Sequence, residues 1–249
     1  MKKYFTGFFM SWGMFTSIPC PLKIWDEEAR GEMLACFPLA GLVIGVLWAI
    51  LVFLTRGVPT VFRAFLTAAV PWVLTGFMHL DGFMDVCDAV LSRRDLETRQ
   101  KILKDSRVGA FAVISVILLI AGTVSICVDI FQEAGDKFCE LCKLVPFVLI
   151  PVSSRAMAGI AVMRFRPMGT SQYSGKTYRK GLLILPSLCL LLAVLIPAFI
   201  CGVNFSPIVT AGVYLLCTLY AKHDLGGMNG DISGFALTIA ETAGLLTLL

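Results

Sequence analysis

A stretch of ten residues, HLDGFMDVCD (79–88), combines one imidazole with three carboxylates at the end of a long apolar run. If the stretch is helical, Asp81, Asp85 and Asp88 stand at i, i+4 and i+7 and share one face. Three like charges at that spacing repel one another unless a cation joins them. Mg²⁺ suits this role, because it binds one or two carboxylates and completes its shell with water and substrate phosphate. We therefore predict a Mg²⁺ site at these aspartates.

Two other interpretations of this stretch stay open. A zinc site from His79, Asp85 and Cys87 has suitable ligand types, although the three residues do not share a helical face. Alternatively, the aspartates form a solvated acidic first turn, which the dipole at a helix N-terminus favours without any metal.

A second cluster, HDLGGMNGDISG (223–234), is rich in glycine and ends on Asp231. Gly227 and Gly230 permit close approach of a ligand to the backbone, so the turn suits phosphate oxygens at the start of a helix. The same composition is also typical of a plain connecting loop. Glu241 follows inside an apolar run, and an ionisable group at that depth is a candidate functional residue because burying it unpaired is costly.

A third cluster, SSRAMAGIAVMRFRPMG (153–169), carries three arginines. Arginine binds phosphate in a fixed fork, so Arg155, Arg164 and Arg166 are candidate phosphate ligands. The alternative for Arg164 and Arg166 is that they extend to the membrane interface. The alternative for Arg155 is a salt bridge to Glu241.

The linker RRDLETRQKILKDSRVGAF (93–111) has the pattern of an amphipathic helix that ends near Asp105. Asp105 or Ser106 would then cap the apolar helix that follows. The other interpretation makes Asp105 a further ligand of the metal or the substrate.

The composition predicts a membrane protein in which these clusters sit at helix ends. Hydrophobic residues make up 57% of the 249-residue chain, charged residues 15%, and the mean hydropathy is +0.84, against about 45–50% and about 25% in soluble domains. We predict one all-α domain, 1–249, a polytopic integral membrane helix bundle with an N-terminal interfacial helix and an amphipathic cytoplasmic helix. Seven transmembrane helices are expected at 36–54, 64–80, 108–128, 144–163, 181–203, 206–220 and 232–249.

The positions of Lys and Arg predict the orientation. Sixteen of the 21 lie before the first run or in the loops 81–107, 164–180 and 221–231. Because Lys and Arg are retained on the cytoplasmic side, the N-terminus and all three clusters are expected to face the cytoplasm. The basic loops suit anionic lipid headgroups of the bilayer, and no nucleic-acid partner is expected. A single C-x-x-C, Cys139 and Cys142, is weak evidence for a metal site, since a zinc site needs a second pair.

The motifs resemble those of the adenosylcobinamide-GDP ribazoletransferase family, the cobalamin synthases. HLDGFMDVCDAV and KDSRVGAF match its H-x-D-G-x-x-D-x-x-D and K/R-D-S-R-x-G-x-x-G/A signatures, and similarity continues in FTSIPCP, FPLAGLVIG, SSRAMAGIAVMRFRPMG and GGMNGDISGFALTIAE. The resemblance implies a multi-pass enzyme of the bacterial inner membrane. Its reaction joins adenosylcobinamide-GDP to α-ribazole, or to α-ribazole 5′-phosphate, giving adenosylcobalamin or its phosphate and GMP, with Mg²⁺.

Carried onto this chain, the resemblance implies roles for individual residues. Metal ligands would be Asp81, Asp85, Asp88 and Asp231, and the general base would be Asp88 or Asp105. The implied substrate-binding residues are His79, Arg107, Arg155, Arg164, Arg166, Gly227, Gly230 and Glu241. A homo-oligomer and association with other enzymes of the cobamide pathway are also expected.

Two rival classes fit the sequence less well. CDP-alcohol phosphotransferases need D-x-x-D-G-x-x-A-R, but Met78 stands at the first Asp and Asp85-Val86 replace Ala-Arg. A divalent cation transporter should carry an internal repeat or acidic residues staged through the membrane, and the sequence shows neither.

Overall fold

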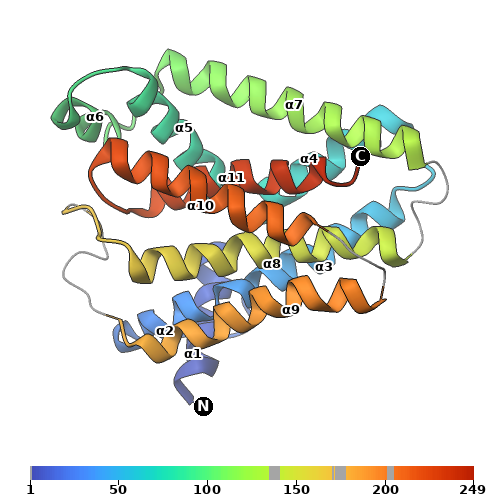
Figure 1. The fold of residues 1–249 in the computed structure, drawn as a ribbon, viewed down its shortest axis with the longest axis horizontal. Coiled ribbons are helices and arrows are strands. Elements are labelled where there is room, and N and C mark those ends of the chain that lie inside the picture. The colour runs from blue at the N-terminus through green and yellow to red at the C-terminus, as the bar shows by residue number, and fades with distance from the viewer. Residues whose placement is uncertain (1, 135–140, 170, 172–177, 201–204) are drawn as a thin grey trace.

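A computed structural model of the chain describes residues 2–134, 141–169, 171, 178–200 and 205–249. Cys139 and the end of the predicted run 181–203 lie outside these residues. Within them, the chain forms a bundle of α-helices packed side by side (Figure 1). The helices are α1 (Lys2–Phe15), α2 (Arg30–Ala35), α3 (Phe37–Leu54), α4 (Thr60–Leu74), α5 (Met78–Leu91), α6 (Leu96–Ile102), α7 (Ala110–Ala134), α8 (Leu141–Arg164), α9 (Ile184–Ile200), α10 (Ser206–Leu225) and α11 (Gly230–Leu246).

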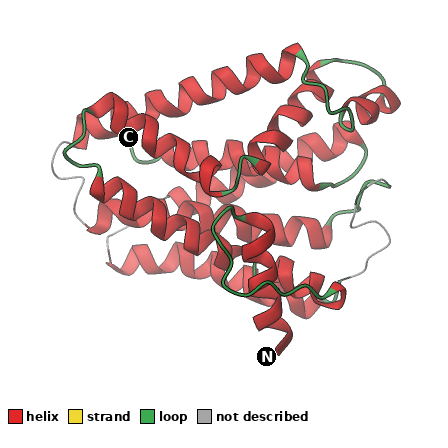
Figure 2. Ribbon diagram, turned by 180° about the vertical axis from the view of Figure 1, so that it is seen from behind, coloured by secondary structure: helices red, strands yellow, loops and turns green. Residues whose placement is uncertain are grey.

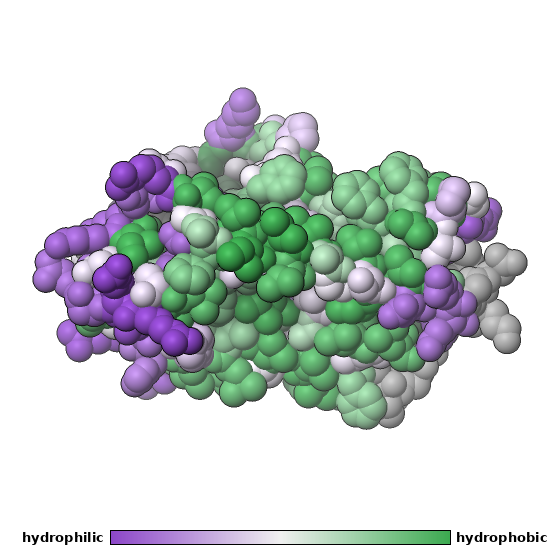
Figure 3. Space-filling model, turned by 90° about the horizontal axis from the view of Figure 1, so that it is seen from above, coloured by the Kyte–Doolittle hydropathy of each residue, from purple (hydrophilic) through white to green (hydrophobic). Residues whose placement is uncertain are grey.

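The surface has the polarity of a membrane protein. Hydrophobic side chains cover the middle of the molecule, and hydrophilic ones gather at its two ends, most of all at the end where α6 lies (Figure 3). Large apolar residues of α7, among them Ile114, Ile117 and Leu118, are more than half exposed. Such a surface is stable only against lipid. The predicted all-α membrane bundle is therefore confirmed.

Fewer helices in the described part of the chain are long and apolar enough to cross a membrane than the seven predicted. Among the described residues, four helical segments are long and apolar enough to cross a membrane: Phe37–Leu54, Ala110–Glu133, Cys142–Arg164 and Lys180–Ala198. The predicted run 64–80 is two helices, α4 and α5, that meet at 90° and count as a fifth span only if the bent pair is one span. The bend follows from Gly76 and Phe77, whose φ angles of 59° and 62° cannot continue a right-handed helix.

Helix α8 lies inside the bundle and packs against α3, α10 and α9. Its contact with α3 is backbone to backbone: a Cβ atom on Gly45 would come within 2.6 Å of the Val148 carbonyl oxygen. The Trp48 and Phe147 rings meet edge to face at 5.2 Å in the same interface. Helix α11 packs against α10, α5 and α8, so both of its long sides are covered. This explains how α11 can hold polar residues without facing lipid.

The loops at one end of the bundle are joined by hydrogen bonds. Seen from the front or from behind, the connections around α6 and between α10 and α11 lie at the same end (Figures 1 and 2). The predicted amphipathic helix is the seven-residue α6, which Asp95 caps. Arg99 pairs with Asp224, and the Gln100 amide donates to the Leu225 carbonyl at 2.9 Å. Helix α6 thereby satisfies carbonyl groups at the C-terminus of α10.

Candidate active site

Helices α5 and α11 touch at their backbones where each carries a glycine. A Cβ atom on Gly82 would lie 2.9 Å from the Cα atom of Asp231, and one on Gly234 would lie 2.9 Å from the His79 carbonyl oxygen. The rings of Phe83 and Phe235 stack at 5.8 Å in the same interface. This close approach places Asp231 of α11 beside the aspartates of α5.

The aspartates of α5 share one face, as predicted. Asp81, Asp85 and Asp88 line one small pocket together with Asp105, Arg107 and Gly109. Asp85 is partly buried and interacts electrostatically with the carboxylates of Asp81, Asp231 and Asp88. Four acidic side chains from two helices therefore converge, and a solvated first turn does not account for Asp85 or for Asp231, which is also partly buried.

Asp105 lies at the rim of this pocket and binds Arg107. The Arg107 Nη2 atom lies 2.6 Å from the Asp105 Oδ2 atom, and its Nε atom also donates to the same carboxylate at 3.0 Å. These hydrogen bonds lower the pKa of Asp105 to about 2. The prediction that Asp105 or Ser106 caps the next helix is wrong, because α7 begins only at Ala110. Asp105 instead binds within its own loop.

Gly109, just before α7, also lines this pocket. A Cβ atom at this position would clash with both carboxylate oxygens of Asp88. The carboxylate of Asp88 therefore lies against the backbone just before α7, and only glycine leaves room for it. The motif KDSRVGAF thus supplies both a polar pair, Asp105 and Arg107, and the space that Asp88 occupies.

The donor set suits Mg²⁺ better than zinc. Within the described part of the chain, no three His, Cys, Asp or Glu side chains lie close enough to hold a metal ion by themselves, so neither the four aspartates nor His79, Asp85 and Cys87 form a preformed metal site. The zinc alternative fails in addition because His79 lies beside Arg155 and not beside Asp85. Mg²⁺ needs only one or two carboxylates, because water and substrate phosphate fill its remaining positions. Asp81, Asp85 and Asp231 offer such oxygen ligands within mutual electrostatic range.

The glycine-rich turn (223–234) packs against the end of the arginine cluster (153–169). The Met168 amide donates to the Met228 carbonyl at 2.8 Å, and the Met228 amide donates to the Arg166 carbonyl at 2.9 Å. Gly227 is required for this docking, because its Cβ atom would lie 2.7 Å from the Met168 nitrogen. Gly230 faces open space, which leaves room for a ligand. The side chains of Arg164 and Arg166 are exposed at the same end of the bundle.

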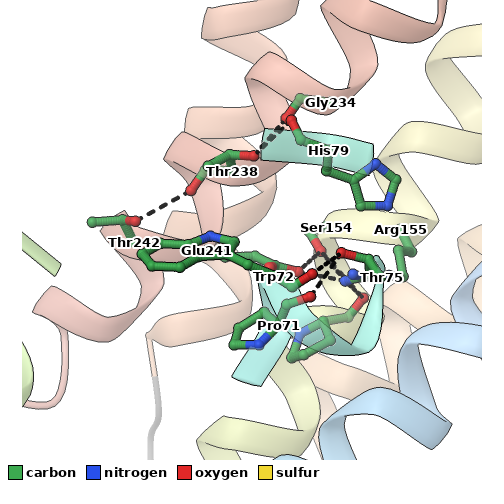
Figure 4. Close-up of polar contacts among 11 residues, drawn as sticks. Pro71, Trp72, Thr75, His79, Ser154, Arg155, Gly234, Thr238, Glu241 and Thr242 are labelled. Atoms are coloured by element: carbon green, nitrogen blue, oxygen red, sulfur yellow. Dashed lines mark hydrogen bonds and ion pairs between the residues drawn. The ribbon is translucent and has the colours of Figure 1, made fainter. Parts of the chain in front are cut away.

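Arg155 and Glu241 lie in the interior and bind each other. Arg155 Nη1 pairs with Glu241 Oε1, and the Ser154 hydroxyl donates to the same oxygen at 2.8 Å (Figure 4). The Arg155 side chain is 0% exposed and that of Glu241 is 6% exposed. The salt bridge considered for these residues is therefore present. Their predicted contact with substrate remains a prediction.

His79 belongs to this interior group rather than to the acidic pocket. Its imidazole is buried and interacts electrostatically with Arg155, which is drawn close to it (Figure 4). The centre of the ring lies 6.1 Å from that of Phe37. Its carbonyl oxygen accepts a hydrogen bond from the Thr238 hydroxyl at 3.2 Å.

The sequence interpretation missed two polar residues. Asn229 caps α11 by accepting from the Ile232 amide, and its Nδ2 atom donates to Asp231 at 2.7 Å. An Asn before a helix is a recognisable cap signal, so this role was open to prediction. Ser154 had no such signal, because its partner Glu241 lies on another helix.

Comparison with known proteins gives a consistent answer. The cobalamin-5-phosphate synthase family model matches residues 7–249. The chain is similar to an adenosylcobinamide-GDP ribazoletransferase of Clostridium perfringens (strain 13 / Type A), with 38% identity over 100% of this chain and 99% of the relative. Relatives of the same name from Halalkalibacterium halodurans and Geobacillus kaustophilus are 32% and 30% identical, each over 97% of this chain and 94% of the relative. No solved structure matches the chain.

Proposed function

The chain belongs to the cobalamin-5-phosphate synthase family, and we propose that it joins adenosylcobinamide-GDP to α-ribazole or α-ribazole 5′-phosphate. The products are adenosylcobalamin, or its 5′-phosphate, and GMP. The observation that supports this proposal is the convergence of Asp81, Asp85, Asp88 and Asp231 on one side of the α5–α11 contact. The rival classes, a CDP-alcohol phosphotransferase and a cation transporter, are set aside because the family match extends over nearly the whole chain.

Asp81, Asp85 and Asp231 would hold Mg²⁺ in this enzyme. When bound, Mg²⁺ neutralises the diphosphate of adenosylcobinamide-GDP and stabilises the phosphate that departs with GMP. The clustered carboxylates are also more stable with a cation among them, because like charges at this spacing repel one another.

A hydroxyl oxygen of α-ribazole attacks the cobinamide-side phosphorus. A new P–O bond forms as the bond from this phosphorus to the bridging oxygen breaks, and GMP leaves with that oxygen. Asp88 accepts the hydroxyl proton. Asp105 is the weaker choice of base, because the hydrogen bonds from Arg107 hold its pKa at about 2. Arg107, which lines the pocket, binds the phosphate oxygens together with Arg164 and Arg166, which are exposed at the same end of the bundle.

The reaction takes place at the cytoplasmic face of the bacterial inner membrane. The acidic pocket is lined by Ile102 of α6 and by Asp105 just after it, at the end of the bundle where hydrophilic side chains gather most (Figure 3). Lys and Arg are enriched in cytoplasmic loops, which supports this orientation. A homo-oligomer and association with other enzymes of the pathway stay predictions.

Release of GMP from adenosylcobinamide-GDP by the purified protein in lipid nanodiscs, with α-ribazole and Mg²⁺ present, tests the proposal. Loss of one charge-stabilising group typically costs about a hundredfold or more in rate, so we expect Asp85→Asn to lower kcat by at least that factor. Asp95→Asn is the matched control, because Asp95 only caps α6 and asparagine caps equally well. Absence of GMP release by the wild type, or full activity of Asp85→Asn, would overturn the proposal.

A further inference from the structure

Asn229 stands two residues before Asp231, at the start of α11, and its backbone is held in place. The residue is 9% exposed, and its backbone is extended. Met228, directly before it, is bound through both of its peptide groups: its amide donates to the Arg166 carbonyl at 2.9 Å, and its carbonyl accepts from the Met168 amide at 2.8 Å. Asn229 therefore enters α11 from a segment that cannot shift freely.

The helix cap decides which way the Asn229 carboxamide faces. Its Oδ1 atom accepts a hydrogen bond from the Ile232 amide at 2.9 Å, and this amide is one of the backbone donors at a helix start that have no partner within the helix. A carboxamide has one acceptor oxygen and one donor nitrogen. A flipped side chain would set its nitrogen donor against the Ile232 donor and lose the cap. The Nδ2 atom is thus held as a donor on the other side.

That donor binds the carboxylate of Asp231. The Asn229 Nδ2 atom lies 2.7 Å from the Asp231 Oδ2 atom, a short distance that is typical of bonds to a charged acceptor. The main chain of Asp231 is fixed separately, because a Cβ atom on Gly82 of α5 would come within 2.9 Å of its Cα atom. The bond from Asn229 holds one of the two carboxylate oxygens and leaves the other available for a ligand.

The orientation of Asp231 matters because it approaches the other acidic residues from a different helix. Asp81 and Asp85 belong to α5, and both interact electrostatically with Asp231 of α11. Like charges repel one another, so the Asp231 side chain would be driven away from α5 if nothing held it. The N–H group of Asn229 opposes this repulsion, since a hydrogen bond to a carboxylate stabilises the charge.

On the basis of the proposed function, we propose that Asn229 is a positioning residue that holds the Asp231 carboxylate toward Asp81 and Asp85, so that the three can share one Mg²⁺. Asn229 does not bind the metal in this role, because its nitrogen is a donor and its oxygen serves the cap. It acts through Asp231 alone. Loss of such a supporting hydrogen bond typically lowers metal affinity or activity about 10–100-fold.

Two variants separate positioning from capping. Serine is also a good N-cap, but it has no amide nitrogen to reach Asp231, whereas alanine supplies neither group. Asn229→Ser should therefore keep the thermal unfolding midpoint of the wild type, and Asn229→Ala should lower it. If the hydrogen bond to Asp231 positions the metal ligand, both variants should bind Mg²⁺ at least tenfold more weakly than the wild type.

Calorimetry on the protein in nanodiscs measures this affinity, with Mg²⁺ titrated in the presence of adenosylcobinamide-GDP and without α-ribazole, so that no turnover occurs. Asp95→Ser is the matched control, because it makes a similar exchange at the cap of α6 and should bind Mg²⁺ as the wild type does. With α-ribazole added, GMP release by Asn229→Ser should need at least tenfold more Mg²⁺ and should recover when Mg²⁺ is raised.

Wild-type Mg²⁺ affinity in Asn229→Ser, with a loss only in Asn229→Ala, would show that Asn229 serves as a cap alone and would overturn the proposal. A wild type that binds no Mg²⁺ overturns it as well. Failure of the proposed function is a different result: the wild type binds Mg²⁺ and Asn229→Ser binds it more weakly, but the wild type releases no GMP.

Discussion

Glu241 and Arg155 form an ion pair in the interior of the helix bundle, where neither side chain is more than 6% exposed. The pair joins α8 to α11, the helix that carries Asp231, and Ser154 adds a hydrogen bond to the same carboxylate. The Arg155 Nη1 atom also donates to the Pro151 carbonyl at 3.3 Å. Two charged groups that the sequence marked as candidate ligands thus serve first to hold two helices together.

Removing one partner of this pair should destabilise the protein. An uncompensated buried charge costs about 3–5 kcal/mol, whereas replacing both partners by apolar residues is often neutral. We expect Arg155→Met to lower the thermal unfolding midpoint in detergent strongly, and the double variant Arg155→Met with Glu241→Met to regain most of the loss. An unchanged midpoint for Arg155→Met, together with a raised KM for adenosylcobinamide-GDP, would instead identify Arg155 as a substrate ligand.

Gly109→Ala should reduce activity without unfolding the protein. The added methyl group would clash with the Asp88 carboxylate and displace it, and a displaced catalytic group typically costs about a hundredfold in rate. Gly122→Ala in the same region of the chain is the control, because nothing lies within 4 Å of its Cβ position. Steady-state kcat and the thermal unfolding midpoint distinguish the two variants. Wild-type kcat for Gly109→Ala would contradict the assigned position of Asp88.

Removal of divalent cations should abolish GMP release, and Mg²⁺ should restore it. We expect Asp81→Asn to raise the Mg²⁺ concentration needed for half-maximal activity at least tenfold, because the metal loses one of its few protein ligands. Titration of Mg²⁺ at saturating adenosylcobinamide-GDP gives this value. Full activity in the presence of excess chelator would exclude the metal site.

The acidic limb of the pH profile should not depend on Asp105. The pKa of Asp105 is lowered to about 2, first by the side-chain hydrogen bond from Arg107, so this carboxylate stays charged throughout a measurable range of about pH 4 to pH 9 and does not titrate there. The profile of kcat/KM for Asp105→Asn should therefore keep the acidic limb of the wild type. A shifted limb in Asp105→Asn, with Asp88→Asn still active, would make Asp105 the base.

Local patterns in the sequence predicted a large part of this protein. The apolar composition predicted the membrane bundle, and the spacing of Asp81, Asp85 and Asp88 predicted their common face on α5. The prediction failed at 64–80, because the chain bends at Gly76 and Phe77, which both adopt positive φ angles, and a single glycine inside an apolar run does not by itself predict a break. It also failed at Asp105. The Asp105 carboxylate can either cap the next helix or pair with Arg107, and the sequence does not show which. The structure decides for the pair with Arg107, because α7 begins only at Ala110.

The sequence by itself determined most of the apolar helices, which charges share a helix face and which motifs link the chain to its family, because these properties depend on residues close together in the chain. Only the tertiary structure decided that Asp231 lies beside Asp81, that Arg155 pairs with Glu241 and that His79 is buried near Arg155. The physical reason is that contacts between distant segments depend on how helices pack, and at the crossing of α5 and α11 this packing is set by Gly82 and Gly234, which let two backbones touch.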